Sequence, residues 1–179
     1  MFDLILKGGL LLDGSGSEGV PADLAVSGGR IAAIGHDLGP AAQTLDVAGF
    51  CVTPGFLDIH RHGDAEVFRE GFGHAELRQG LTTILNGNCG LSLAPFGAAH
   101  REEILRYLQP ITGGETGGIP TGTMDEYLSA LEKRPLPLNV GMLVGNGTVR
   151  TDVCGYRAEA PEDFTPIHRR LERALAEGA

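Results

Sequence analysis

The sequence has 179 residues, with 14 Lys and Arg residues against 23 Asp and Glu residues, and a formal net charge of −9 at pH 7. This acidic balance argues against nucleic acid or an anionic membrane as a partner, because both attract a basic surface that replaces their counterions. Hydrophobic residues make up 42% and charged residues 21%, which is typical of a folded globular chain and excludes a disordered one.

Three features bear on the cellular compartment. Cys51, Cys89 and Cys154 are odd in number and widely spaced, which indicates reduced thiols rather than a disulfide framework. The start MFDLILKGG lacks the basic residues and the long apolar run of a signal peptide, and no apolar stretch is long enough to span a bilayer. We therefore expect a cytoplasmic protein.

Short apolar runs separated by glycine occupy the first 53 residues. We expect strands over residues 2–6, 10–12, 23–26, 30–34, 44–47 and 50–52. Gly28 and Gly29 predict a hairpin turn after Ser27, because paired glycines supply the positive φ values that a tight turn needs. Residues 1–53 are interpreted as a small β-rich, sandwich-like segment without chemistry of its own, and not as the start of a parallel sheet.

Strands and helices alternate over residues 54–179. We expect strands over residues 55–60, 81–85 and 138–144, and helices ending near residue 80, over 98–108 and 123–134, and beginning near Pro161 or Pro166. Thr123 and Glu126 form a capping box at the best-marked helix start. This alternation predicts an α/β fold with about three β/α units, whereas a closed TIM-type barrel has eight.

The strongest local signal for chemistry is the His60-Arg61-His62 segment at the end of the first of these strands. If the strand continues through it, Asp58, His60 and His62 share one face, because side chains alternate. Two imidazoles at this spacing can converge on one zinc ion, and Asp58 could orient a histidine or complete the ligand set. A pair of surface histidines at a strand end is the alternative.

The second signal is Cys89, which follows the next strand in the run Asn86-Gly-Asn-Cys-Gly90. A thiolate is a good zinc ligand, although a cysteine in a glycine-rich turn can also be a small structural residue. His60, His62 and Cys89 fall where consecutive parallel strands end, the edge on which α/β barrels carry their chemistry. We expect these three residues to bind a metal.

A third signal follows the strand over residues 138–144. There, Asn146 could offer an amide to a substrate and Arg150 could meet a substrate carboxylate. A glycine-rich exit from the strand, without a role in binding, explains this segment equally well. We place Cys154 in a loop and assign no role to Arg61.

Taken together, these motifs resemble the amidohydrolase superfamily. The stretch from Thr53 to His62, TPGFLDIHRH, opens the α/β part, and Gly87–Pro95, GNCGLSLAP, is similar to the cysteine segment of the N-acyl-D-amino-acid deacylases. The segment Leu143–Arg150 is similar to that family's third-strand exit. The resemblance runs along the whole chain and indicates the N-terminal portion of such an enzyme.

The resemblance implies a partial β/α barrel and zinc-dependent hydrolysis of the amide bond in a small molecule, an N-acyl-D-amino acid. His60, His62 and Cys89 would be metal ligands, and the general-base aspartate is expected beyond residue 179. No catalytic residue is thus assigned within the chain, which we expect to be inactive alone. The family often has His where Asn146 stands and a small residue where Arg61 stands, and both departures bear on substrate preference.

Two alternatives stay open. The chain could be a non-catalytic truncated product, or a half-barrel that self-associates or docks onto a complementary chain. It could also act on cyclic amides, as hydantoinase-like and dihydroorotase-like amidohydrolases do. The Cys89 segment speaks against cyclic amides, because those relatives usually carry a modified lysine as the metal bridge.

Overall fold

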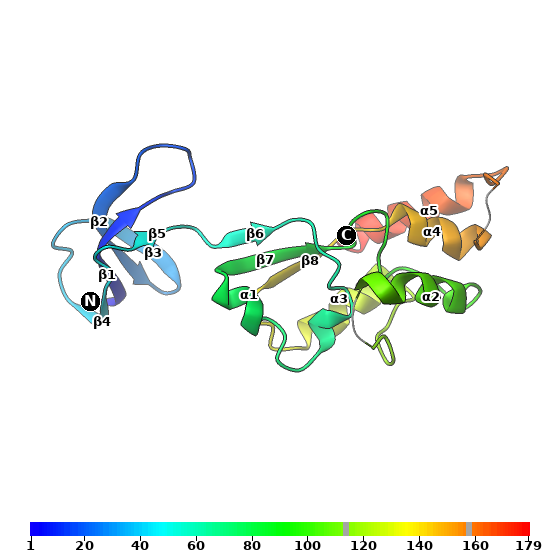
Figure 1. Ribbon diagram of the computed structural model, residues 1–179, viewed down its shortest axis with the longest axis horizontal. Coiled ribbons are helices and arrows are strands. Elements are labelled where there is room, and N and C mark those ends of the chain that lie inside the picture. The colour runs from blue at the N-terminus through cyan, green and yellow to red at the C-terminus, as the bar shows by residue number, and fades with distance from the viewer. Residues whose placement is uncertain (113–114, 157–158) are drawn as a thin grey trace. The chain divides into compact units, whose positions relative to one another are not determined.

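The computed structural model describes residues 1–112, 115–156 and 159–179 and divides the chain into two compact units, Met1–Pro54 and Gly55–Ala179 (Figure 1). Among the described residues, the first unit contains only strands, and every helix lies in the second unit. The chain is therefore a mixed α/β protein, as the sequence predicts.

The first unit is one sheet of five strands, in which β3, β2, β1 and β4 are neighbours in that order and β5 also pairs with β1. The strands are β1 (Phe2–Leu11), β2 (Val20–Ser27), β3 (Arg30–Gly35), β4 (Ala41–Asp46) and β5 (Cys51–Val52). Strand β1 is antiparallel to β2 but parallel to β4 and β5. The first unit is therefore rich in β-structure, as expected, but it is one mixed sheet and not a sandwich-like arrangement.

Strand β1 also replaces the two short strands expected from the glycine pair at residues 8 and 9. The pairing of β1 with β2 shifts register between Leu6 and Gly9, and Gly8 has a φ of +78°. A bulge therefore absorbs the glycines within one continuous strand.

The hairpin between β2 and β3 is confirmed. Ser27 pairs with Arg30, which leaves Gly28 and Gly29 as the two turn residues. Their φ values are +57° and +73°, so both occupy the left-handed region that a type I′ turn requires.

The second unit contains three parallel strands in the order β6, β7, β8 (Figure 1). Their bounds are β6 (Phe56–Asp58), β7 (Leu81–Asn86) and β8 (Asn139–Met142). The register between β6 and β7 is irregular, because Phe56 lies opposite Leu81 whereas Leu57 lies opposite Thr83. Parallel strands end at the same edge of a sheet, so the segments after β6, β7 and β8 are brought near one another.

Short helices connect and follow these strands. They are the 3-10 helix η1 (Glu66–Phe68), α1 (His74–Arg78), α2 (Arg101–Thr112), α3 (Met124–Glu132), α4 (Asn146–Cys154) and α5 (Thr165–Ala176). The predicted start of α3 is confirmed: the Glu126 backbone N–H donates to the Thr123 hydroxyl over 3.0 Å. No helix in the described ranges has both the length and the apolar character needed to cross a bilayer.

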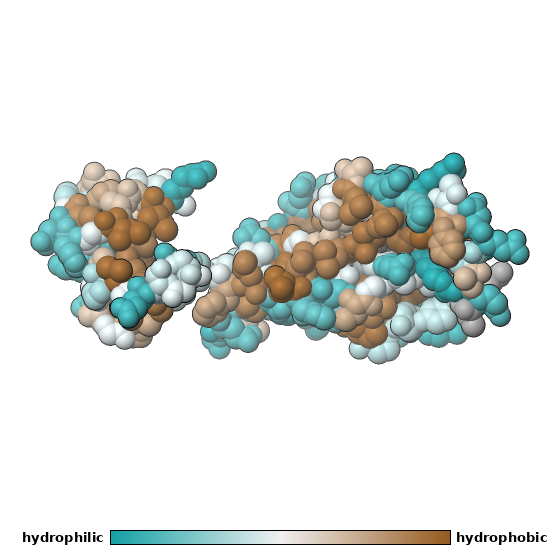
Figure 2. Space-filling view, turned by 90° about the horizontal axis from the view of Figure 1, so that it is seen from above, coloured by the Kyte–Doolittle hydropathy of each residue, from teal (hydrophilic) through white to brown (hydrophobic). Residues whose placement is uncertain are grey.

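The core of the second unit lies between the sheet and the helices. Its largest fully buried side chains include Ile84 from β7, Phe96 from the following loop, Leu108 from α2 and Tyr127 from α3. Other apolar side chains stay exposed, and Figure 2 shows apolar atoms gathered in a band along one face of this unit. The exposed set includes Phe56, Leu57, Ile59, Leu77, Leu143, Leu171 and Leu175.

Candidate metal centre

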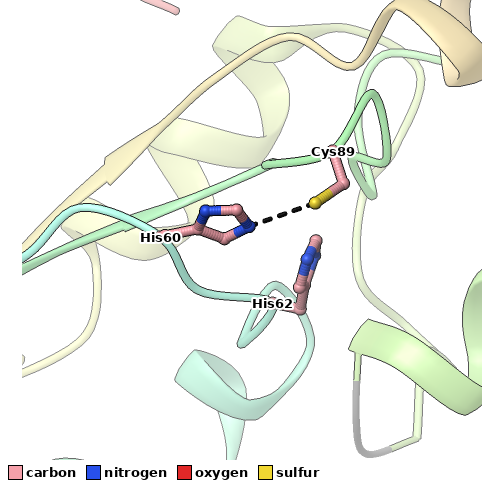
Figure 3. A group of neighbouring side chains, drawn as sticks. All are labelled: His60, His62 and Cys89. Carbon is pink, nitrogen blue, oxygen red and sulfur yellow. Dashed lines mark hydrogen bonds between the residues drawn. The ribbon is translucent and has the colours of Figure 1, made fainter.

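Three metal-binding side chains meet at the carboxyl ends of β6 and β7. His60 and His62 lie in the segment that follows β6, and Cys89 lies three residues after the end of β7. Their ligand atoms all lie within 4.8 Å of one another (Figure 3). The structure therefore brings together the three residues that the sequence analysis selected.

The contacts within this cluster are short. His60 Nε2 lies 3.1 Å from Cys89 Sγ, and the rings of His60 and His62 are 5.8 Å apart at an interplanar angle of 72° (Figure 3). Ligand atoms that share one tetrahedral zinc ion are about 3.3–3.6 Å apart, given Zn–N near 2.0–2.1 Å and Zn–S near 2.3 Å. The 3.1 Å between His60 Nε2 and Cys89 Sγ and the upper limit of 4.8 Å for the whole cluster lie on either side of that spacing.

The histidine pair also has unused bonding capacity. His62 Nδ1 is buried and has no hydrogen-bond partner in the described part of the chain. A buried polar atom is normally satisfied, so a ring nitrogen without a partner, on one of the three clustered residues, fits a site that binds a cation. The set of two imidazoles and one thiolate suits zinc better than the hard cations Mg²⁺ and Ca²⁺, which prefer oxygen ligands.

The route by which the histidines converge differs from the prediction. Strand β6 ends at Asp58, so His60 and His62 do not alternate along an extended strand but lie in the irregular segment that follows it, with a bend at His60. Asp58 Oδ1 accepts a hydrogen bond from the His60 backbone N–H over 3.2 Å, a turn that ends the strand. Asp58 thus holds the backbone of His60, whereas the sequence analysis expected it to orient a ring or to act as a ligand.

Polar side chains near the three ligands in sequence join the loop after β6 to the loop after β7. Asp64 is completely buried and accepts hydrogen bonds from the backbone N–H groups of Leu93 (2.9 Å) and Gly87 (3.4 Å). Burial raises the pKa of Asp64 to about 6, outweighing these two hydrogen bonds, which lower it. Asp64 is not among the residues predicted from the sequence, although its position two residues after His62 is a signal for it.

Arg61, to which the sequence analysis assigned no role, anchors the segment between the two histidines. Its guanidinium forms a short ion pair with Glu76 of α1, whose side chain is only 7% exposed, and lies 3.8 Å from the Asp58 carboxylate. A buried carboxylate needs such a partner, because an unpaired charge in the interior is strongly unfavourable. Arg61 therefore fixes the histidine segment against α1.

The segment after β8 is a helix and not the loop that the glycines suggested. Helix α4 begins at Asn146 and includes both Arg150 and Cys154. The Thr148 backbone N–H donates to the Gly90 carbonyl over 3.2 Å, so the start of α4 lies against the loop that carries Cys89. Asn146 is thus close to the cluster in space, whereas Arg150 donates to the backbone carbonyl of Glu159 over 2.9 Å.

The other two cysteines take no part in the cluster. Cys51 belongs to β5 of the first unit and is exposed, and Cys154 ends α4.

The fold and the cluster define an α/β protein with a candidate metal centre where its parallel strands end. Comparison with known proteins gives relatives over almost the whole chain, although no family model matches. A D-aminoacylase of Alcaligenes xylosoxydans xylosoxydans is 40% identical over 99% of this chain and 36% of its own length. An N-acyl-D-aspartate deacylase of the same organism is 36% identical over 99% of this chain and 35% of its own length.

Solved structures agree with these relatives. A D-aminoacylase, described as defining a novel subset of amidohydrolases, is 37% identical and superimposes on the whole chain with a TM-score of 0.86, over 37% of its own length. The N-acyl-D-glutamate deacylase of Bordetella bronchiseptica, solved with zinc and a phosphonate inhibitor, is 31% identical and gives a TM-score of 0.83 over 98% of this chain and 36% of its own. A further D-aminoacylase structure, solved to define the functional role of its binuclear metal centre, gives a TM-score of 0.83.

The resemblance seen in the sequence is therefore confirmed: along its whole length the chain is homologous to the N-acyl-D-amino-acid deacylases, a group of amidohydrolases. The chain spans a little over one third of the length of the relatives that it matches.

Proposed function

We propose that this chain supplies His60, His62 and Cys89 to the zinc centre of an enzyme that hydrolyses N-acyl-D-amino acids. The observation that carries the proposal is the convergence of these three ligand atoms within 4.8 Å, at the ends of adjacent parallel strands. The relatives named above support the substrate class, because they are D-aminoacylases and deacylases of N-acyl-D-amino acids.

Within this proposal the second unit, Gly55–Ala179, contributes part of a β/α barrel, and residues 1–53 form an appendage without chemistry of its own. Bound zinc would lower the pKa of water toward 7 and polarise the amide carbonyl of the substrate. The chain's own residues hold that ion in place: the imidazoles of His60 and His62 donate lone pairs, and Cys89 donates as a thiolate.

Asn146 is proposed as a substrate contact. It begins α4 beside the loop of Cys89, where its side-chain amide could hydrogen-bond an acyl or carboxylate group. Arg150 stays a predicted carboxylate partner, now one turn farther along α4. A local cation is required, because the net charge of −9 repels an anionic substrate at long range.

The metal site is tested by titrating the 179-residue chain with Co²⁺, which substitutes for zinc and absorbs light when a thiolate binds it. We expect a sulfur-to-cobalt charge-transfer band that Cys89→Ala abolishes. Cys51→Ala is the matched control, because Cys51 is also an exposed thiol but lies outside the cluster, and it should leave the band unchanged. A band that survives Cys89→Ala would show that the thiol is not a ligand.

The substrate class is tested in a chimera in which these residues replace the matching third of the Alcaligenes D-aminoacylase. We expect release of free amino acid from N-acetyl-D-methionine, and far less from its L-enantiomer or from a hydantoin. Cys89→Ala should remove this activity, and Cys51→Ala should retain it. A chimera that binds metal but prefers the hydantoin would favour the cyclic-amide alternative.

A further inference from the structure

The buried carboxylate of Asp64, two residues after His62, is hydrogen-bonded to the loop that carries Cys89 without belonging to the candidate metal centre. It is fully buried and is not part of the His60, His62 and Cys89 cluster. Its two oxygens accept from Gly87 N–H at 3.4 Å and from Leu93 N–H at 2.9 Å. Gly87 precedes Cys89 and Leu93 follows it, so the carboxylate is hydrogen-bonded to the cysteine loop both before and after Cys89.

Two asparagines make further links between the same loops. The Gly63 N–H donates to Asn86 Oδ1 over 2.9 Å, and Asn88 Nδ2 donates to the Arg61 carbonyl over 3.3 Å. Arg61 and Gly63 are the neighbours of His62. These two hydrogen bonds therefore tie the backbone on both sides of His62 to the loop that carries Cys89.

The cysteine loop needs such support because its backbone is strained. Cys89 has a φ of +57°, and Gly87 and Gly90 on either side both have a φ of +77°. A left-handed conformation is unfavourable at a residue other than glycine, because its Cβ comes too close to the following carbonyl oxygen. Such a conformation persists only where the surrounding contacts over-determine it.

We propose that Asp64 is the positioning residue of the metal centre, holding the Cys89 loop so that its thiol faces His60 and His62. This role rests on the proposed function only in that the three side chains bind a metal. The chemistry suits the task, since a carboxylate offers two acceptor oxygens and can hold two backbone amides at once. An apolar or amide side chain of the same size cannot do so.

The test is Co²⁺ titration of the full chain carrying Asp64→Asn. The substitution keeps the size of the side chain but replaces one acceptor oxygen by an NH₂ group, which then faces a backbone N–H. We expect the Kd for Co²⁺ to rise about tenfold, the lower end of the range for groups that orient metal ligands, and the charge-transfer band to change in position or intensity. In the metal-free chain, iodoacetamide should alkylate Cys89 at a rate different from that of the parent chain.

Asp152→Asn is the matched control. Asp152 is also a buried carboxylate that accepts a backbone N–H, from Gly97 over 2.6 Å, but Gly97 lies eight residues beyond Cys89 in the loop after β7, and the other Asp152 oxygen pairs with Arg170 of α5. It should leave the Kd and the band unchanged. An equal effect in both variants would assign Asp64 a general structural role and overturn the proposal.

The remaining outcomes separate the two proposals. If the parent chain and Asp64→Asn bind Co²⁺ with the same Kd and band, the positioning role fails while the metal site stands. If the parent chain binds no Co²⁺, the metal site fails, and the positioning role with it. Should Asp64→Asn lose its helical circular dichroism, Asp64→Glu is titrated in its place. If Asp64→Asn and Asp64→Glu both unfold while Asp152→Asn stays folded, Asp64 is a structural residue and the positioning role fails.

Discussion

The ion pair between Arg61 and Glu76 offers a test of what holds the histidine segment in place. Removing one partner of a fully buried pair costs about 3–5 kcal/mol, because the other charge is left in the interior. Glu76 has a side chain only 7% exposed, but Arg61 is 26% exposed, so water can partly replace the guanidinium. We therefore expect Arg61→Met, which keeps much of the aliphatic packing, to reduce the free energy of unfolding by about 2–3 kcal/mol.

Urea unfolding followed by circular dichroism at the helix band measures this loss. Every described helix lies in Gly55–Ala179, so the helical signal reports on the unit that contains the pair. With an m-value of about 2 kcal/mol per molar urea, the midpoint should fall by about 1 M or slightly more. The double variant Arg61→Met with Glu76→Gln should recover part of the loss, because the uncompensated charge is then gone.

Arg69→Met is the control. Arg69 forms an ion pair with Glu66 in the same unit, but its side chain is 62% exposed, and a surface pair contributes at most about 1 kcal/mol. Equal midpoint shifts for Arg61→Met and Arg69→Met would refute the reasoning. So would a double variant that is no more stable than Arg61→Met alone.

Two further substitutions test local elements of the second unit. Thr123→Ala removes the hydroxyl that accepts from the Glu126 N–H at the start of α3, and we expect a loss of about 1 kcal/mol in the same urea assay. Gly87→Ala places a methyl group on the Leu143 carbonyl oxygen at a φ of +77°, so it should cost more than about 2 kcal/mol and weaken Co²⁺ binding. Gly117→Ala, where a Cβ meets nothing within 4 Å, should change neither, and equal effects at both glycines would contradict this account.

The features that the sequence predicted well are those with local causes. The turn at Gly28 and Gly29 depends on backbone freedom at two positions, and the start of α3 depends on a hydroxyl three residues before an amide. His60 and Cys89 approach each other in part because each of them follows one of two adjacent parallel strands. Each of these causes is visible in a short stretch of sequence.

The start of α4 was missed because its causes are distant in sequence. Gly145 and Gly147 look like helix breakers, yet a Cβ on either would lie within 3 Å of the Gly90 carbonyl oxygen. They are glycines because this helix start approaches the cysteine loop closely, and the Thr148 hydroxyl donates to the Ser92 carbonyl over 2.9 Å. Similarly, the pairing of Arg61 with Glu76 spans 15 residues that no periodic pattern connects.

The irregular pairing of β6 with β7 sets how far along the strand direction His60 and His62 lie relative to Cys89. Thr82 is passed over between the partners of Phe56 and Leu57, so Asp58 comes to lie opposite Ile84 instead of Thr83. If the two strands paired regularly, the segment after β6 would be shifted by one residue, roughly 3.3 Å, back along β7. Such an offset is as large as the spacing between two ligands on one ion, so a single inserted residue acts here as a spacer that aligns the two loops.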